Sequence, residues 1–420
     1  MYQKSILDNG LRVITSTMPH TRSVCINIFI GAGSRHESEE EAGISHFIEH
    51  LCFKGTQRRP TAKEIAESIE GVGGLLNGGT DKEFTIYWCK VARPHFSLAL
   101  DLTVDMLRCS KFSAEDMERE RSVIIEEINE SMDSPQHRVN MLIDEVVWPA
   151  QALGRDIAGS KETVSALSRE MLLGYLSCQY APNNTIIGVA GEISHEEVLS
   201  SIGEILGDWA VATPRSPYPA EDSQDAPRLR IDRRDTEQAH LCLAVRGLPF
   251  AHPDRFTLDL LNVILGEGMS SRLYLEIRER RGLAYDIHSY ADHFLDSGTV
   301  TIYAGVDPKN INDTIAVILE TLASLKEEVP SLEITKAKEL VKGRLLLRME
   351  DSRSVAGWLG GQELLTGHIY TVDEVASIID AITVEDLKRV AAQMLVTEKI
   401  SVAIVGPVDD EHRLRSLLKL

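Results

Sequence analysis

The chain has 420 residues, which is more than one compact core holds and indicates two domains of about 200 residues each. Hydrophobic residues make up 43% and charged residues 26% of the chain, a globular composition that excludes disordered, collagen-like and coiled-coil classes. The 44 Lys and Arg stand against 64 Asp and Glu, giving a net charge of −20, so we expect no nucleic-acid partner.

No apolar run approaches the roughly 18 residues that a membrane span requires, so we expect no membrane span. The first residues follow a strand-like pattern and have neither the apolar core of a signal peptide nor an Arg- and Ser-rich transit stretch. These features together predict a cytoplasmic protein.

In chain order, the first predicted element is a hairpin over residues 6–14, because Asn9-Gly10 tolerates the positive φ angles of a type I′ turn. Residues 24–30 predict a buried strand, and residues 84–91 predict a second strand from their β-branched and aromatic side chains. Hydrophobic residues at helical spacing predict five helices, at residues 41–53, 62–69, 94–107, 114–131 and 138–147.

The chain repeats itself at an offset of 215 residues. Residues 165–172 align without gaps on residues 380–387, and the strand and glycine at 186–191 align on 401–406. We therefore predict an α+β fold of two homologous domains, each a mainly antiparallel sheet covered by helices. We place the first domain at residues 1–210, a proline-rich, extended and solvated linker at 211–227, and the homologous second domain at 228–420.

The sequence His46-Phe-Ile-Glu-His50 lies within the helix predicted after the buried strand. Residues four apart share a helix face, so His46 and His50 can reach one ion, with Glu49 beside it. This is the inverted zinc-peptidase spacing, in which two imidazoles and a third protein ligand leave a position for water. Glu49 is then the expected general base, and we predict one zinc ion per chain.

The third ligand is expected on the helix at residues 114–131. Glu120 and Glu127 lie two turns apart, and Val123 and Ile124 are the residues between them on that face. A carboxylate on an apolar face needs a partner such as a metal, whereas Glu118, Arg119 and Glu126 suit a solvated face. Spacing alone leaves open which of the two glutamates is the ligand.

In these motifs the chain resembles the pitrilysin/insulinase family of zinc peptidases, in its two-domain branch with mitochondrial processing peptidase and bacterial processing proteases. The resemblance covers nearly the whole chain, from residues 46–56 through Glu120-Arg-Ser-Val-Ile-Ile-Glu-Glu127 to the duplicated half. It implies that Glu127 is the third metal ligand. It also implies that Glu120 orients the ligands from behind them.

The resemblance implies further site residues. The segment Gly73–Thr80 is similar to the one that leads into the family's substrate-pairing edge strand, which makes Asn77 a substrate-binding candidate. In the second half, Arg278 and Tyr285 match an arginine and a tyrosine seven apart, suited to holding the substrate carbonyl and steadying the oxyanion. Because one chain carries both halves of the site, the resemblance implies a homodimer, with a heterodimer with a related, zinc-less subunit as the alternative.

The sequence thus predicts a zinc-dependent endopeptidase that cleaves unfolded peptides or presequence-like segments. Residues 1–210 are expected to form its zinc-binding catalytic domain, and residues 228–420 a substrate-contacting domain without metal ligands. The rival hypothesis is a non-catalytic scaffold or partner subunit of a peptidase complex. Such subunits usually lose the metal-binding set, and this chain keeps His46, Glu49 and His50.

Overall fold

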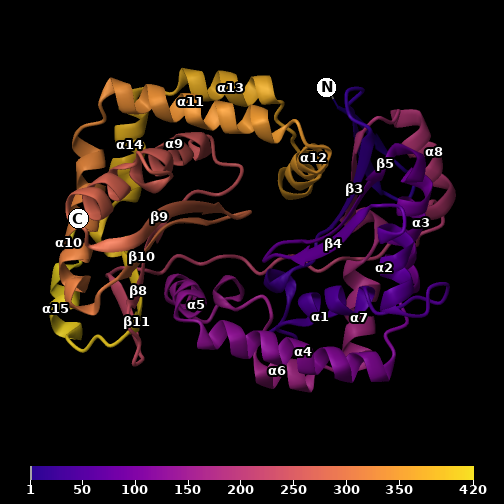
Figure 1. Cartoon of the computed structure of the whole chain (residues 1–420), viewed down its shortest axis with the longest axis horizontal. Helices are drawn as coiled ribbons and strands as arrows, with labels where there is room; N and C mark the ends of the chain where they lie inside the picture. The colour runs from indigo at the N-terminus through magenta and orange to yellow at the C-terminus, as the bar shows by residue number, and fades with distance from the viewer. Residues whose placement is uncertain (1) are drawn as a thin grey trace. The chain divides into compact units, whose positions relative to one another are not determined.

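The computed structural model describes residues 2–420 and divides into two compact units (Figure 1). Each unit contains one sheet with a single parallel strand pair, and helices cover it. The α+β class predicted from the sequence is therefore confirmed. Unit 1 comprises residues 2–128, 156–218 and 346–371, and unit 2 comprises residues 129–155, 219–345 and 372–420.

The sheet of unit 1 has six strands in the order β1-β2-β6-β3-β5-β4. Strands β2 and β6 run parallel, and the other neighbours run antiparallel. This order leaves β4 at one edge, where no strand of the described residues pairs with its outer side. The strands are β1 Gln3–Ile6, β2 Arg12–Thr17, β3 Ser23–Ile30, β4 Leu75–Thr80, β5 Thr85–Ala92 and β6 Thr185–Gly191.

Both faces of this sheet are buried, because alternate residues of each strand pack against different helices. Ile28 and Ile187 face a core formed with α2, α3 and α8, whereas Phe29 and Ile186 face α12. Unit 1 thus needs helices on two sides. The helices are α1 Ile44–Cys52, α2 Ala62–Glu70, α3 Phe96–Cys109, α4 Ala114–Asp133, α6 Lys161–Ala166, α7 Arg169–Gln179, α8 His195–Leu206 and α12 Ser352–Thr366, with α4 running a few residues into unit 2.

The hairpin predicted at residues 6–14 is present as β1 and β2, but its turn is not type I′. Gly10 has a φ of 84°, whereas Asn9 is not among the residues with positive φ. The Gly10 N–H donates to Leu7 O and the Leu7 N–H to Leu11 O, which defines a three-residue loop with a bulge at glycine. Asn9 instead donates its side-chain amide to Leu206 O and Trp209 O, so its role is to tie the turn to α8.

Unit 2 repeats this architecture with five strands in the order β7-β11-β8-β10-β9. Its parallel pair is β7 and β11, as β2 and β6 are in unit 1. The strands are β7 Arg228–Arg233, β8 Ala239–Arg246, β9 Ala284–His293, β10 Gly298–Val306 and β11 Ser401–Gly406. The helices are α5 Pro135–Val147, α9 Arg255–Gly266, a π-helix at Tyr274–Arg280, α10 Ile311–Glu327, α11 Ser331–Arg348, α13 Val372–Ala381, α14 Val384–Met394 and α15 Glu411–Leu417, with α11 ending in unit 1.

Helices α5 and α12 are exchanged between the two halves of the sequence. Helix α5 precedes the linker but packs against β8 and β11 of unit 2, and α12 follows the linker but packs against β3 and β6 of unit 1. The offset of 215 residues carries residues 135–147 onto residues 350–362, within the region of α12. The compact units therefore differ from the contiguous stretches 1–210 and 228–420 in these two segments. Those boundaries stay a prediction about the duplicated sequence.

The predicted linker at residues 211–227 contains no helix or strand. Most of its residues are exposed, and a few of them bond to residues of one unit or the other. Tyr218 donates its N–H to Arg35 O and accepts from the Arg35 guanidinium within unit 1. In unit 2, buried Gln224 donates to Ile400 O. Across the described residues, no helix combines the length and the apolar character that crossing a membrane requires.

Candidate metal centre

Helix α1 carries the His46-Phe-Ile-Glu-His50 sequence and is amphipathic. Phe47, Ile48 and Leu51 are buried and fix one face of the helix against the unit 1 core. Since residues three and four apart lie on one face, the same packing directs His46, Glu49 and His50 to another face. The apolar positions of the motif thus orient its polar ones.

The start of α1 is held by a carboxylate from the preceding loop. Gly43 has a φ of 95° and no capping side chain of its own. The fully buried Glu37 accepts the N–H groups of Gly43 and Ser45, at 2.8 and 2.9 Å from its two carboxylate oxygens. A negative charge at a helix N-terminus is favourable for both its hydrogen bonds and the helix dipole. Glu37 therefore fixes the first turn of the helix immediately before His46.

Helix α4 brings the two glutamates to α1, and they differ in burial. Glu120 is 2% exposed, whereas the Glu127 side chain is 44% exposed. Between them Ile124 is buried, but Val123 is exposed, so the apolar face is narrower than the sequence predicts. Arg121, whose guanidinium lies over the Phe47 ring at 5.4 Å, donates to Val164 O and Leu167 O and so ties α4 to α1 and α6.

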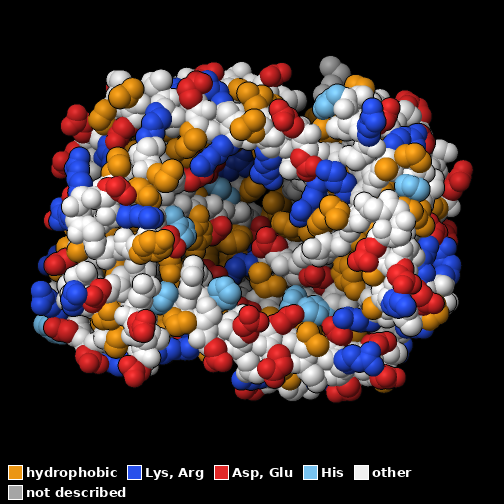
Figure 2. Space-filling model, viewed as in Figure 1, with side chains coloured by type: hydrophobic (Ala, Val, Ile, Leu, Met, Phe, Trp, Pro, Cys, Tyr) orange, Lys and Arg blue, Asp and Glu red, His pale blue; other side chains and the backbone are white. Residues whose placement is uncertain are grey.

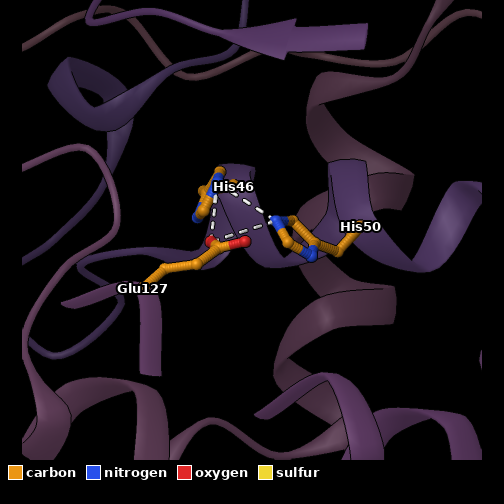
Figure 3. A group of neighbouring side chains, drawn as sticks. All are labelled: His46, His50 and Glu127. Atoms are coloured by element: carbon orange, nitrogen blue, oxygen red, sulfur yellow. Dashed lines mark hydrogen bonds and ion pairs between the residues drawn. The ribbon is translucent and has the colours of Figure 1, made fainter. Parts of the chain in front are cut away.

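His46, His50 and Glu127 converge so that one ligand atom from each lies within 4.8 Å of the others (Figure 3). The two Nε2 atoms are 3.2 Å apart, and Glu127 Oε2 lies 3.9 Å from His46 Nε2 and 3.5 Å from His50 Nε2. Ligand atoms about 2.0–2.2 Å from a tetrahedral zinc ion are separated from one another by roughly 3.3 Å. The donor set and its spacing therefore fit zinc, and Glu127 rather than Glu120 closes the triangle.

Burial lowers the pKa of His46, a candidate ligand, to about 4, and the neighbouring His50 adds to the shift. A neutral imidazole has a nitrogen lone pair for a metal. The Nδ1 atom of His46 is buried without a hydrogen-bond partner in the described residues.

Glu49 does not belong to the triangle but lies beside it. Thr80, the last residue of β4, donates its hydroxyl to Glu49 Oε2 at 2.7 Å. A Cβ atom added to Gly78 would lie 3.2 Å from Glu49 Oε1. The absence of a side chain at Gly78 therefore lets the Glu49 carboxylate lie close to the strand. Burial raises the pKa of Glu49, against the opposing effect of the Thr80 hydrogen bond. A carboxylate with a raised pKa is a better proton acceptor for general-base work.

Glu120 contacts the candidate ligand His50 on the side of the ring away from the other two candidate ligands. Its Oε2 atom lies 3.1 Å from His50 Nδ1, and its Oε1 atom forms an ion pair with Lys54 at 2.8 Å. A hydrogen bond from Nδ1–H to Glu120 leaves the Nε2 lone pair for a metal and fixes the ring orientation. Lys54 offsets the cost of burying the Glu120 charge.

Asn77 lies in the middle of the edge strand β4. Its side-chain oxygen accepts the N–H of Gly78 at 2.8 Å. Asn77 alternates with Leu76 and Gly78, whose positions face the core and Glu49. The structure therefore places Asn77 on the strand next to Glu49, while its role in substrate binding stays a prediction.

Arg278 and Tyr285 meet in unit 2. The Arg278 guanidinium lies 4.8 Å from the centre of the Tyr285 ring and 5.0 Å from that of Tyr274. Arg278 belongs to the π-helix, and Tyr285, which is 76% exposed, belongs to β9. A cation over two aromatic rings is held in place without a carboxylate partner. The structure brings the two side chains together, and their role in catalysis stays a prediction.

Sequence reasoning missed four residues that support this centre. Glu37 holds the start of α1, and Lys54 pairs with Glu120. Gly78 and Thr80 both contact the carboxylate of Glu49. An acidic residue shortly before a helix that lacks its own capping side chain is a signal for Glu37. Lys54 becomes visible only when α4 is placed beside α1, and Gly78 and Thr80 only when β4 is placed there.

Two family models and several known proteins match this chain. The family model described as "Insulinase (Peptidase family M16)" matches residues 12–161, and the one described as "Peptidase M16 inactive domain" matches residues 166–341. The chain is 36% identical over 408 residues to the uncharacterized zinc protease YmxG of Bacillus subtilis, covering 97% of this chain and 98% of that one. It is 35% identical over 421 residues to the uncharacterized zinc protease ML0855 of Mycobacterium leprae, covering 99% and 94%.

Two solved structures share the whole fold. A protease from Helicobacter pylori has a TM-score of 0.92 at 23% identity, with 97% of this chain and 99% of that one covered. A chain of complex III2 from Candida albicans has a TM-score of 0.85 at 21% identity, with both chains covered completely. The chain therefore belongs to the insulinase family of peptidases, peptidase family M16, and its curated relatives carry the name zinc protease.

Proposed function

We propose that this chain is a zinc-dependent endopeptidase that hydrolyses unfolded peptides or presequence-like segments. The observation that carries the proposal is the triangle of His46 Nε2, His50 Nε2 and Glu127 Oε2. Its spacing fits one zinc ion with a fourth position left for water. The relatives named zinc proteases support the same activity class.

Zinc held by these residues would polarise the scissile carbonyl and make a neighbouring water molecule more acidic. Glu49 takes the proton from the attacking water and delivers it to the nitrogen of the leaving amine. Its hydrogen bond to Thr80 Oγ1 holds the carboxylate in one orientation. Glu120 and Lys54 keep His50 in the tautomer that presents Nε2.

The free edge of β4 supports a peptide substrate in extended form. Such an edge accepts a strand through main-chain hydrogen bonds, which demand little of the substrate sequence. Asn77 lies in that strand, one residue from Gly78, the glycine that contacts Glu49. Most main-chain groups of a folded protein are already paired, whereas those of an unfolded peptide or presequence-like segment are free to pair with the edge.

Arg278 and Tyr285 are proposed to bind the substrate backbone and to stabilise the oxyanion. The proposed assembly is a homodimer, with a heterodimer with a related subunit as the alternative. Analytical ultracentrifugation of the purified chain distinguishes a dimer from a monomer. The cytoplasmic location likewise stays a prediction, which cell fractionation tests.

A non-catalytic role is the second candidate. The second half matches a family model whose description contains the words "inactive domain", and one structural neighbour is a chain of complex III2. A scaffold does not require the metal-binding set. The retained His46, Glu49, His50 and Glu127 favour the peptidase.

The test is hydrolysis of a quenched fluorogenic peptide by the purified chain, with zinc content measured in each sample. We expect turnover that a chelator abolishes and added zinc restores. Glu49→Gln is expected to keep its zinc and lose turnover, since the general base is gone. Bound zinc without turnover in the unaltered chain, at any protein concentration, would favour the scaffold role.

A further inference from the structure

Helix α12 brings an arginine onto the sheet of unit 1, one strand away from the edge strand β4. Arg353 lies in the first turn of α12, and its guanidinium carbon is 3.8 Å from the centre of the Trp88 ring of β5. Tryptophan is the aromatic side chain that attracts a cation most strongly. Trp88 is 8% exposed, whereas Arg353 is exposed. The buried indole therefore holds the guanidinium while leaving its N–H groups accessible.

Arg353 forms no ion pair with a carboxylate of residues 2–420. Asp351, two residues earlier, is already committed, because it pairs with Lys90 and accepts the Ser354 N–H at 3.0 Å. One carboxylate thus accompanies two cations. Lys and Arg side chains gather between α12 and β3 (Figure 2). The planar fork of an arginine matches a carboxylate with two parallel hydrogen bonds.

The strand register connects this arginine to the free edge. Trp88 pairs with Asn27 of β3 on one side and with Asn77 of β4 on the other. Directly opposite residues of neighbouring strands share one face of a sheet. Gly78, the next residue of β4, faces the other way, towards Glu49. The proposed general base and the arginine therefore lie on opposite faces of the same edge.

A peptide that pairs with the edge of β4 alternates between these two faces. Its residue opposite Asn77 points to the side of Trp88 and is adjacent to the residue opposite Gly78. The added strand lies two strand spacings, about 10 Å, from β5. An arginine and a glutamate side chain together span such a distance. No charged residue of β4 intervenes, since the strand reads Leu-Leu-Asn-Gly-Gly-Thr.

We propose that Arg353 determines specificity by binding the carboxylate of an Asp or Glu side chain of the substrate, on the face of β4 away from Glu49. This inference rests on the proposed peptidase function and adds a sequence preference to it. Pairing with the strand edge demands little of the substrate sequence, and Arg353 adds the demand. The preference belongs to particular positions, whereas the net charge of −20 disfavours acidic peptides as a whole.

The test uses peptides of equal length that carry Glu, Gln or Lys at one varied position. That position is moved through four residues on each side of the cleaved bond, and kcat/KM is measured for each peptide. Glu and Gln have the same shape, so their ratio isolates the charge. We expect about three- to tenfold faster cleavage with Glu at one position, or at two positions two residues apart, and no such gain elsewhere. Salt at about 1 M should reduce the gain.

Two variants of the exposed arginine test its role. Arg353→Gln is expected to bring the Glu-to-Gln ratio to within about twofold of unity. Arg353→Glu is expected to reverse the preference, so that the Lys peptide is cleaved faster than the Gln peptide at the same position. A purely structural role of Arg353 would produce no reversal.

The matched control is Arg413→Glu, which changes the net charge equally at an exposed site on α15 of unit 2. It should retain the preference of the unaltered chain. Three results would overturn the proposal. They are no gain with Glu at any position, a gain that persists in Arg353→Gln, and an equal loss in Arg413→Glu.

A binding measurement separates this proposal from the proposed function. Fluorescence anisotropy with the Glu49→Gln chain reports the affinity for the same peptides without cleavage. Tighter binding of the Glu peptide, when the unaltered chain never cleaves any peptide, would support the role of Arg353 and reject the peptidase. Cleavage with equal kcat/KM for Glu and Gln at every position would keep the peptidase and reject the role of Arg353.

Discussion

Helices α1 and α9 occupy equivalent places in the two units, because each follows the central strand of its sheet, β3 or β8. Helix α1 presents two imidazoles and a carboxylate, whereas α9 contains no histidine and no glutamate. The residues of α9 at the repeat offset of 215 are buried and apolar. They are Leu261, Ile264 and Leu265, in place of His46, Glu49 and His50.

Helices α4 and α11 differ in the same way. The offset carries Glu120 onto Thr335 and Glu127 onto Lys342, and Lys342 pairs with Glu339 and Asp380. Unit 2 therefore lacks all three ligands and has a cation where unit 1 has the third ligand. The shared topology shows that the metal-binding set is not needed for the fold.

The largest effect is expected when α1 is made to resemble α9. His46→Leu should abolish zinc binding and lower kcat by at least about 10³-fold, because two ligands do not hold a catalytic zinc. The stability of the zinc-free chain should not fall, since the buried, unpartnered Nδ1 of His46 is removed. Metal analysis, peptide hydrolysis and urea unfolding in chelator measure the three quantities. Retained zinc would show that His46 is not a ligand.

The reverse change makes α9 resemble α1 by placing a histidine in it. Leu265→His places a polar ring at a site that is 2% exposed, and it should lower the free energy of unfolding by about 2–4 kcal/mol. The matched change in unit 1 is His50→Leu, which should alter zinc-free stability by less than about 1 kcal/mol. Equal destabilisation by the two variants, measured by urea unfolding, would mean that the two helices tolerate polar groups alike.

Removing the charge that contacts His50, that of Glu120, is expected to have a smaller effect, on zinc affinity. Glu120→Gln keeps an oxygen near His50 but removes the charge, so we expect zinc affinity to fall about 10–100-fold. Thr335→Ala, at the equivalent position of α11, should leave zinc affinity unchanged. Competition with a chromogenic chelator measures both variants. Unaltered affinity in Glu120→Gln would remove Glu120 from the centre.

The smallest effect concerns the loop before α1, residues 31–43, which is longer than the loop before α9, residues 247–254. Burial lowers the pKa of His36 in this loop from 6.5 to about 4. The unfolded chain thus binds more protons between these values, and stability falls as pH falls from 6.5 towards 4. Between pH 7 and 5, the wild type should lose about 1–2 kcal/mol more than His36→Phe. Equal losses in urea unfolding would show that His36 is not the group responsible.

The sequence predicts well what depends on local pattern. The strands and helices of the first half form close to the predicted ranges, and the helix spacing brings His46 beside His50. The choice between Glu120 and Glu127 needed the family resemblance, because both occupy one helix face. Distances in the folded chain then place Glu127 in the triangle and Glu120 behind His50.

Features that depend on distant contacts could not be predicted. Thr80 reaches Glu49 only because β4 packs beside α1, and Glu37 caps a helix that it precedes by several residues. The turn at Asn9 departs from type I′ because its side chain bonds to α8, far along the chain. Local propensity carries no information about such partners.

The exchange of α5 and α12 sets an order of events during synthesis. The sheet of unit 1 has an uncovered apolar face, with Phe29 and Ile186, until residues 352–366 have left the ribosome. Helix α5 is synthesised early but can pack only after β8 and β11 have been made, and β11 is the last strand of the chain. A cut at the linker therefore yields two fragments that each carry the other's missing helix. Mixing those fragments, rather than folding either one alone, is the route to an intact molecule.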